Sequence, residues 1–432
     1  MLRSASDKLV VPFRIDQKSQ VFVVDRPLNI VKVIPYPLPV LRFGGPVVQA
    51  QVVCRELAAR GHEVRVVTTD IDLPADIPRD QWLENDGYHV CYSSTSPHHR
   101  MPPYYTPGIR RPLQETLKTA DVVQTNIGLT LTNDMVRKLA RRAGVPYVYN
   151  AEGALCPKRL QIKSFEKKLF RYFYENRIVR EAAACQAVSQ YERDTLLEWG
   201  VHPERIAVIP NGFSLPPVVS EEAKQASRQQ LGYADDDVVI LFMGRISQIK
   251  GIDLLLTAFE RIRNEFPQAQ MIVAGPDEGI QAALTQFVRK HGLEKRVRFP
   301  GIIAGEEKTN ALRSADIFAL TSHSEGLPNA VIEGLGYGLA MLLTHRCNVP
   351  EVADYNAGHV VEAEVEPIEQ ALRKLLEDAQ QRANCQQNAR RLAVERFSLD
   401  KVVDDLENLY RGLADSPSDA NGTANLQSTA SP

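Results

Sequence analysis

The sequence lacks the long apolar run that a membrane-spanning helix requires, since no uninterrupted stretch approaches about twenty apolar residues. We therefore expect no transmembrane helix. Met1–Gln17 mixes charged and apolar residues, without the long apolar core of a signal peptide. Net charge is also nearly absent, because 51 Lys and Arg residues face 53 Asp and Glu residues. No basic field therefore indicates a nucleic-acid partner.

Cysteine is sparse, and its spacing excludes two common roles. The six cysteines form no CxxC pair, and no His and Cys residues have the spacing of a metal site. We expect free buried thiols, no bound metal and a cytoplasmic location. A dinucleotide fingerprint is missing too, because the glycine-rich segment Gly334–Gly338 falls at the end of an expected helix and not after a strand.

The 432 residues exceed the size of one hydrophobic core, which predicts two domains. Short β-branched runs alternate with longer amphipathic segments in both halves, a pattern typical of parallel sheets covered by helices. Pro and Gly gather in Ile209–Pro217, and a new series of strands and helices begins after it. This segment is therefore the expected domain linker.

Two cations follow the strand that we expect at Val238–Met243. Arg245 and Lys250 lie in the loop between Gly244 and the next helix. Because parallel sheets bind ligands beyond the carboxyl ends of their strands, these cations suit a diphosphate, although each also fits an ordinary solvated surface. Gly275 follows the next strand and permits close backbone approach, but such glycines also serve ordinary turns.

The segment Ser324–Gly334 gives the clearest signal. A strand expected at Ile317–Thr321 leads into a turn containing Gly326, with Pro328 expected at the first helical position. A helix N-terminus with free backbone N–H groups is an anion site. The expected donors are the N–H groups of Leu327, Asn329 and Ala330.

Two carboxylates belong to the same segment. Glu325 precedes the expected helix, and Glu333 lies about two turns along it. A carboxylate can accept hydrogen bonds from the vicinal hydroxyls of a ribose or hexose. The structural alternatives are a dipole or capping role for Glu325 and a solvated helix face for Glu333.

Together these residues resemble the donor-binding domain of the retaining group 1 glycosyltransferases, family four of the carbohydrate-active enzymes, which have the GT-B fold. Phe43–Pro46 and Gly61–Val64 resemble that family's opening glycine loop and the entry to its second strand. Pro210–Gly212 resembles its linker. The resemblance covers about Leu28 to Arg411 and so nearly the whole chain.

The resemblance implies an α/β fold with two Rossmann-like, doubly wound domains facing a cleft, and a C-terminal helix that crosses back to the N-domain. We expect the following division: an N-terminal extension (1–27), an acceptor-side domain (28–212), a donor-binding domain (213–395), a crossover helix (396–412) and a disordered tail (413–432).

The resemblance also implies roles for individual residues. Arg245 and Lys250 would hold the donor diphosphate, and Glu333 would bind the ribose hydroxyls. Glu325 and the backbone of Gly326–Asn329 would hold the transferred sugar and a phosphate. The remaining expected donor-site residues are Gly44, Gly45, Gly244, Gly275, Leu327 and Pro328, with Ser189 and Asn211 as weaker candidates at the cleft.

One motif departs from the family. Its members often have two histidines in the first half, at the positions of Gln124 and Asn126 here. Asn126 can donate a hydrogen bond to the reacting sugar, but it cannot relay a proton. We keep Asn126 among the catalytic candidates, with Arg245, Lys250 and Glu325.

The implied reaction transfers a hexose from a UDP- or GDP-type sugar to a glycan, glycolipid or lipid-linked acceptor, with retention of configuration. Fixed cations and a helix N-terminus stabilise the leaving diphosphate, so no cofactor or metal is expected. Asp70 and Asp72 resemble a metal-binding DxD, but we interpret them as an ordinary loop after an early strand. Two alternatives stay open: a nucleotide-sugar 2-epimerase of the same fold, and a catalytically silent protein that binds sugar nucleotides.

A basic and aromatic segment, Lys158–Arg180, offers a second kind of contact. Such a helix can lie on an anionic membrane surface and bring the enzyme to a lipid-linked acceptor at the inner face of the membrane. The alternative is a helix whose aromatic residues pack on the sheet and whose Lys side chains face solvent.

Overall fold

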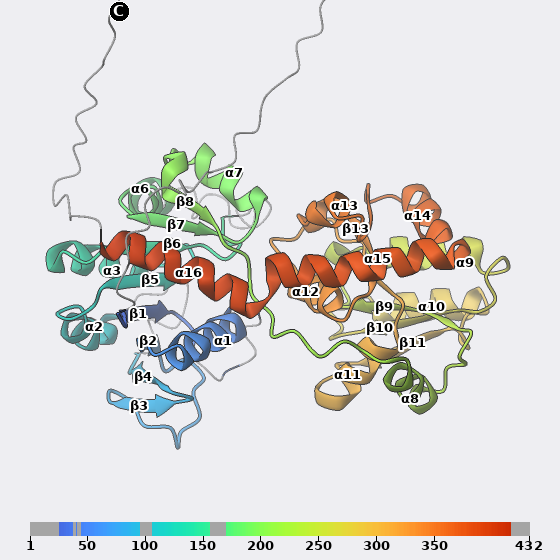
Figure 1. Cartoon of the computed structure of the whole chain (residues 1–432), viewed down its shortest axis with the longest axis horizontal. Coiled ribbons are helices and arrows are strands. Elements are labelled where there is room, and N and C mark those ends of the chain that lie inside the picture. The colour runs from blue at the N-terminus through green and yellow to red at the C-terminus, as the bar shows by residue number, and fades with distance from the viewer. Residues whose placement is uncertain (1–25, 38–39, 41–44, 96–105, 156–169, 416–432) are drawn as a thin grey trace, which may run out of the picture.

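The computed structural model describes residues 26–37, 40, 45–95, 106–155 and 170–415. Figure 1 shows two α/β domains side by side, each with one sheet covered by helices. The predicted fold class is confirmed. The predicted N-terminal extension and C-terminal tail fall almost entirely outside the described residues.

The N-domain contains an eight-stranded sheet with the order β3-β4-β2-β1-β5-β6-β7-β8. All neighbouring strands are parallel except β3 and β4. The strands are β1 (Asn29–Ile34), β2 (Glu63–Thr69), β3 (Trp82–Asn85), β4 (Tyr88–Ser93), β5 (Val122–Asn126), β6 (Tyr147–Asn150), β7 (Ala184–Ala187) and β8 (Ile206–Val208).

Helices cover both faces of this sheet. On one face, α1 (Gly45–Ala59) shares a core with α16 (Leu399–Ala414), the last helix of the chain. The other face packs against α2 (Arg110–Thr116), α3 (Leu131–Ala143), α6 (Asn176–Arg180) and α7 (Gln190–Glu198). Short helical turns lie at Pro107–Ile109, Arg171–Glu175 and Pro203–Arg205.

The C-domain contains a six-stranded, all-parallel sheet with the order β11-β10-β9-β12-β13-β14. The strands are β9 (Val238–Met243), β10 (Ala269–Ala274), β11 (Val297–Gly301), β12 (Ile317–Leu320), β13 (Ala340–Thr344) and β14 (Gly358–Val361). The helices are α8 (Glu221–Leu231), α9 (Ile252–Ile262), α10 (Gln281–Lys290), α11 (Gly305–Ser314), α12 (Asn329–Gly336), α13 (Glu351–Asp354), α14 (Val365–Glu377) and α15 (Ala379–Leu392). Short turns lie at Gln248–Lys250 and His345–Cys347.

The last two long helices of the chain, α15 (Ala379–Leu392) and α16 (Leu399–Ala414), pack on different domains. After α15 come a π-helical turn (Ala393–Phe397) and extended Ser398, whose hydroxyl caps α16 by accepting from the Lys401 backbone N–H at 3.3 Å. Figure 1 shows α15 along the C-domain and α16 across the N-domain. α16 contributes five buried side chains to the N-domain core: Leu399, Val402, Val403, Leu406 and Tyr410. The predicted crossover helix is therefore confirmed.

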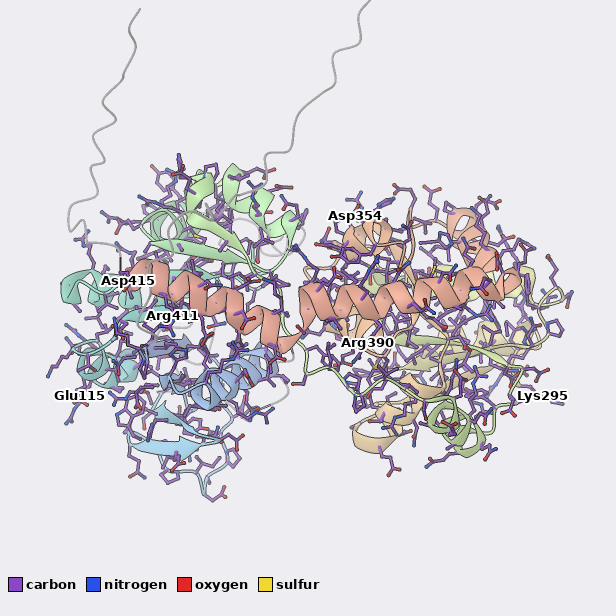
Figure 2. The ribbon with its side chains drawn as sticks, in the orientation of Figure 1. Glu115, Lys295, Asp354, Arg390, Arg411 and Asp415 are labelled. Atoms are coloured by element: carbon purple, nitrogen blue, oxygen red, sulfur yellow. The ribbon has the colours of Figure 1, made fainter. Side chains whose placement is uncertain are left out.

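The two segments that pass between the domains hold one another. Phe213 of the linker donates its backbone N–H to the Phe397 carbonyl at 2.8 Å and accepts from the Leu399 N–H at 3.0 Å. Arg390 of α15, labelled in Figure 2, donates to the Pro216 carbonyl at 2.7 Å. The passage between the domains is thus a paired, hydrogen-bonded connection.

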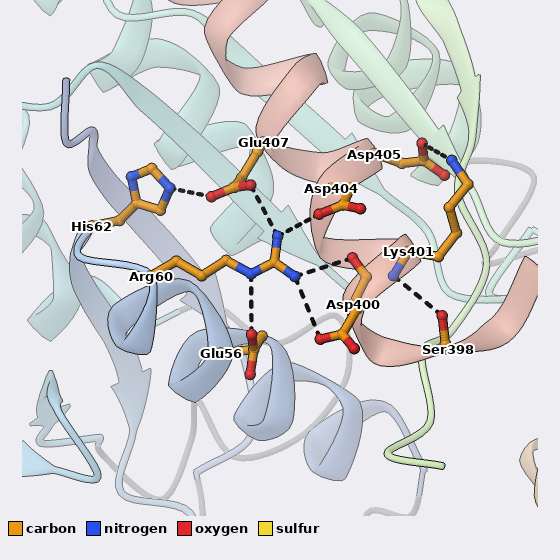
Figure 3. A network of polar contacts seen from close by, with 9 residues as sticks. All are labelled: Glu56, Arg60, His62, Ser398, Asp400, Lys401, Asp404, Asp405 and Glu407. Carbon is orange, nitrogen blue, oxygen red and sulfur yellow. Dashed lines mark hydrogen bonds and ion pairs between the residues drawn. The ribbon is translucent and has the colours of Figure 1, made fainter. Parts of the chain in front are cut away.

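A polar cluster fixes α16 against the end of α1 (Figure 3). Arg60 donates to Asp404 at 2.5 Å, to Glu407 at 3.0 Å and to Glu56 at 3.0 Å. The His62 ring accepts from the Leu28 backbone N–H at Nδ1 (3.0 Å), so its Nε2 donates to Glu407 at 2.5 Å. One cation and one imidazole therefore bind three acidic side chains from two distant parts of the chain.

The sequence pattern missed four elements. Helices α8 and α13 and strands β3 and β14 were not expected. α8 buries mainly polar side chains, with Arg228 reaching Asp316 at 2.5 Å, so no apolar periodicity reveals it. β3 and β14 are four-residue edge strands. The five described cysteines are free and buried, as predicted, while Cys156 lies outside the described residues.

Candidate active site

The chain changes direction across the C-domain sheet between β9 and β12. From β9 it continues to β10 and β11 on one side, whereas β12, β13 and β14 lie on the other. The loops that leave β9 and β12 therefore diverge, and this is the point where open parallel sheets bind ligands. The predicted residues Lys250 and Glu325 lie on these two loops.

Glycine allows these loops to pack against one another. Gly275 has φ +146°, and a Cβ there would lie 1.7 Å from the carbonyl oxygen of Gly244. Gly251 has φ +61°, and a Cβ there would lie 2.1 Å from the carbonyl oxygen of Thr321. No other residue fits such approaches without backbone movement. The backbones of Gly244 and Gly275 thus lie in direct contact at the carboxyl ends of β9 and β10.

Lys250 and Glu325 form an ion pair across this point. The Lys250 Nζ lies 2.6 Å from Glu325 Oε1, and both side chains are largely buried. Ser322 donates to the same carboxylate oxygen at 2.5 Å. Asn348, from the loop after β13, donates to the Glu325 carbonyl at 2.7 Å. Three loops therefore fix one cation and one anion at the carboxyl ends of the strands.

Arg245 makes a different pair. Its guanidinium donates to Glu278 at 2.6 Å, and both side chains are about half exposed. Asp277 next to Glu278 accepts the backbone N–H groups of Gly279, Ile280 and Gln281 at 2.8–3.0 Å. Those hydrogen bonds, led by the one from Gln281, lower the Asp277 pKa. The turn after β10 is thus held by its own aspartate, and Arg245 lies on its outer side.

The start of α12 corrects one expectation. Pro328 is the N-cap, with extended φ −78° and ψ 112°, and Asn329 is the first helical residue. No side chain of the described residues caps this end. A proline ring forbids the helical conformation to the residue before it, which keeps Leu327 outside the helix. The Val331 N–H donates to the Pro328 carbonyl at 3.0 Å, so the N–H groups of Asn329 and Ala330 are the ones available to an anion.

Glu333 lies within α12 and forms an ion pair of its own. Its Oε2 is 2.7 Å from the Nζ of Lys308 on α11, and the carboxylate is mostly shielded. The solvated helix face considered for Glu333 is therefore not what the structure shows. Asn329 accepts a hydrogen bond from Asn211 of the linker at 2.9 Å. Asn211 therefore contacts the donor-side helix directly.

The N-domain presents Asn126 at the carboxyl end of β5. The side chain is 4% exposed, and its amide donates to Glu152. Gln124, two residues earlier, is 1% exposed and contacts other residues: it donates to Gln186 at 2.7 Å and accepts from Tyr410 of α16. The two positions that replace the family histidines therefore differ in their partners. Gln124 is bonded to the interior of the domain and to α16, whereas Asn126 is bonded to Glu152 beyond the end of the sheet.

Three predicted residues add less to the site. Ser189 is the N-cap of α7 and accepts from the Glu192 N–H at 3.3 Å, which gives it a structural role. Gly45 begins α1, whereas Gly44 lies outside the described residues. Asp70 accepts from the Thr95 backbone N–H at 2.9 Å, consistent with a loop role for this DxD-like sequence.

Glu152 is a residue that the sequence reasoning missed. It follows β6 by two residues, and Gly153 beside it faces Gly326 of the donor loop: a Cβ on Gly326 would lie 3.5 Å from the Gly153 Cα. The signal was available, because Asn150-Ala151-Glu152-Gly153 follows a buried parallel strand at its carboxyl end. The two domains thus meet at Gly153 and Gly326.

The basic and aromatic segment is described only from Phe170 onward; residues 158–169 lie outside the described part. Three aromatic side chains are exposed, Tyr172 (75%), Phe173 (59%) and Tyr174 (39%). These three rings therefore face solvent and not the sheet. Among the described residues, no helix is long and apolar enough to cross a membrane.

Comparison with known families assigns both halves of the chain. Residues 223–392 match the family described as "Glycosyl transferases group 1", and residues 44–212 match the "Glycosyl transferase 4-like domain". These two regions contain every predicted site residue. The expected linker Ile209–Pro217 runs across the end of the first matched region into the interval between them.

Individual proteins show the same similarity. A D-inositol 3-phosphate glycosyltransferase of Kineococcus radiotolerans is 31% identical over 192 residues, 42% of each chain. One of Jonesia denitrificans is 25% identical over 394 residues, 85% of this chain and 91% of that protein. The chain thus spans less than half of the first relative.

Among solved structures, Anabaena HepE in complex with UDP matches with a TM-score of 0.70 and 19% identity, over 89% of this chain and 99% of that one. Neighbours of this kind are GT-B glycosyltransferases, so the fold is GT-B. The two matched regions and the fold agree. The chain belongs to the group 1 glycosyltransferase family.

Proposed function

We propose that the protein transfers a hexose from a nucleoside diphosphate sugar to a hydroxyl acceptor. The observation that most supports this is the Lys250–Glu325 pair at the point where the chain reverses across the sheet, beside the uncapped start of α12. A cation and free N–H groups suit the diphosphate, and a carboxylate suits sugar hydroxyls. The UDP complex of the HepE neighbour supports a donor of this class.

In this proposal each site residue has one task. Lys250 stabilises the charge that grows on the leaving phosphate, and the first-turn N–H groups of α12 bind the same group. Glu325 accepts hydrogen bonds from hydroxyls of the transferred sugar, and Glu333 accepts them from the ribose hydroxyls. Arg245 exchanges its exposed partner Glu278 for a donor phosphate, since an exposed pair contributes little.

We propose that transfer proceeds with retention and needs no metal. The resemblance to the retaining family supports retention, with the leaving phosphate accepting the proton of the attacking hydroxyl. Lys250 and the N-terminus of α12 supply the positive potential that a metal would otherwise provide. Product analysis by NMR, which reports the anomeric configuration, tests the first statement.

A glycan, glycolipid or lipid-linked acceptor is the proposed second substrate, with the protein in the cytoplasm at the inner face of the membrane. The exposed side chains of Tyr172, Phe173 and Tyr174 support this, because aromatic rings favour the interface between lipid and water. The basic residues of 158–180 are the expected contact with anionic lipid.

The test of the donor site is a calorimetric titration of UDP, GDP and ADP. We expect one of them to bind the wild type and to lose about 10- to 100-fold in affinity in Glu333→Ala, since a hydrogen bond to a charged group contributes about 1.5–3 kcal/mol. Glu377→Ala is the control, because Glu377 is an exposed carboxylate at the C-terminal end of a different helix, α14.

Each result decides a different question. Binding that is lost only in Glu333→Ala establishes the donor site and its nucleotide. Transfer to an acceptor separates the enzyme from a silent binding protein, and conversion of the free donor into its 2-epimer would indicate the epimerase. No binding of any of the three at millimolar concentration would refute the proposed function.

A further inference from the structure

Glu152 occupies an unusual position at the domain interface. It has φ +48°, a left-handed conformation that is costly for a residue with a Cβ. Its neighbour Gly153 donates its backbone N–H to Glu192 of α7 at 2.8 Å, which holds the turn. The turn is thus fixed on the N-domain side while Gly153 faces Gly326 of the donor loop.

Only one oxygen of the Glu152 carboxylate is used. Oε1 accepts from the side-chain amides of Asn126 and, at 3.4 Å, of Asn150. Oε2 has no hydrogen-bond partner among the described residues, although it is shielded from solvent. The Oδ1 of Asn126 is likewise buried and unpartnered within the described part. Two acceptor oxygens without donors therefore lie together at the carboxyl ends of β5 and β6.

These oxygens end a buried polar layer that crosses the sheet. Asn126, Asn150 and Gln186 are register partners on β5, β6 and β7. Gln186 accepts from Asn150 at 3.2 Å and from Gln124 at 2.7 Å, and Gln124 accepts from Tyr410. The other amides of the layer have partners, so the unpaired oxygens are confined to its cleft end.

The groups around Glu152 shift the pKa of its carboxyl group in both directions. Burial raises its pKa to about 7, against the hydrogen bond from Asn126 and the charge of Lys32 on β1, which lower it, while Glu192 on α7 raises it. From the opposite domain, Glu325 precedes the Gly326 that approaches this turn, and its carboxylate is paired with Lys250. The carboxyl group therefore changes charge near neutral pH.

A buried acceptor without a donor is unfavourable by about 1–3 kcal/mol. A hydroxyl that donates to this oxygen removes that cost. A hydroxyl that donates to the carboxylate favours its ionised form, and therefore lowers its pKa. Ligand binding here must then release a proton near neutral pH.

Resting on the function proposed above, we propose that Glu152 and Asn126 bind a sugar hydroxyl in the cleft, with Glu152 as its ionised acceptor, so that sugar binding is linked to proton release. The hydroxyl comes from the transferred sugar or from the acceptor. Both place a polyhydroxylated ring between the domains, and the experiment separates them.

The test measures protons released on binding, by calorimetry in two buffers of different ionisation enthalpy at about pH 6.5. The probes are UDP and UDP-glucose, GDP and GDP-mannose, and ADP and ADP-glucose. We expect the nucleotide sugar to release about half a proton or more beyond its nucleoside diphosphate. Glu152→Gln should abolish the excess and still bind the diphosphate, because the glutamine oxygen can keep both asparagine partners. Glu198→Gln, an exposed carboxylate on α7, is the control that should retain it.

The source of the hydroxyl follows from a second titration, of D-inositol 3-phosphate into protein saturated with the diphosphate. An excess with the nucleotide sugar assigns the hydroxyl to the transferred sugar, and an excess only with D-inositol 3-phosphate assigns it to the acceptor. The same proton release in wild type and Glu152→Gln for both ligands would overturn the inference while the proposed function stands. A wild type that binds none of the nucleotides refutes both.

Discussion

Replacing Tyr410 with phenylalanine tests whether the buried hydroxyl of α16 holds the crossover helix on the N-domain. The Tyr410 side chain is 0% exposed, and its hydroxyl donates to the Gln124 Oε1 and hydrogen-bonds the buried Lys32. Tyr410→Phe keeps the ring and its packing. It removes both hydrogen bonds and leaves an amide oxygen and a buried ammonium group without that partner.

The expected loss follows from these two contacts. A neutral hydrogen bond contributes about 1 kcal/mol, and one to a charged group about 1.5–3 kcal/mol. We therefore expect the free energy of unfolding of the N-domain to fall by about 3 kcal/mol. With a urea m value near the upper end for small domains, about 3 kcal/mol/M, the midpoint should fall by about 1 M.

Tryptophan fluorescence isolates the relevant domain, because both tryptophans, Trp82 and Trp199, lie in the N-domain. The control is Tyr355→Phe, whose hydroxyl donates to Glu395 on the C-domain surface at 2.8 Å. We expect it to leave the fluorescence midpoint unchanged. A midpoint for Tyr410→Phe within about 0.2 M of the wild type, or about 0.5 kcal/mol, would refute the reasoning.

Three further perturbations have defined outcomes. Lys250→Met should lower kcat about 100- to 1,000-fold in a donor-turnover assay, whereas Lys290→Met, at the far end of α10, should not; equal effects would remove Lys250 from the mechanism. Arg60→Met should lower N-domain stability by about 1–2 kcal/mol, and an unchanged urea midpoint would show that its four contacts contribute nothing. Burial raises the Glu175 pKa to about 7, so the native state holds an extra proton between about pH 4.5 and 7. The free energy of unfolding should therefore fall by about 3 kcal/mol as the pH rises through that window. Glu175→Gln should lose this slope in urea unfolding measured at several pH values, and an unchanged slope would contradict the assignment.

The sequence predicted the parallel-sheet architecture because strand interiors in such sheets are continuous apolar runs. The strand at Val238–Met243 was predicted with the bounds that the structure has. Helix α8 was missed because its contact with the sheet is a salt bridge between Arg228 and Asp316, and side chains of that kind leave no apolar period. The position of Pro328 was off by one residue, because proline fits both the first helical position and the residue before it.

Candidate site residues could be chosen from the sequence where one loop contains the chemistry. The segment around Glu325 and Glu333 could be interpreted because a strand, a turn and a helix start are consecutive in the sequence. Pairings between loops could not be predicted in this way. Nothing in the sequence indicates that Lys308 faces Glu333, or that Arg245 lies beside Glu278 on the outer side of its loop.

The sequence alone predicted the fold class, the two-domain organisation and a set of candidate donor-site residues, because each prediction depends on local order: apolar runs, glycines after strands and a helix start beside carboxylates. Tertiary structure alone decided which charges meet and which polar atoms stay without partners. Glu152 illustrates the difference, since its neighbours Asn126 and Lys32 precede it by 26 and 120 residues. Burial and hydrogen bonding there depend on strand order and domain contact, which short-range sequence patterns do not encode.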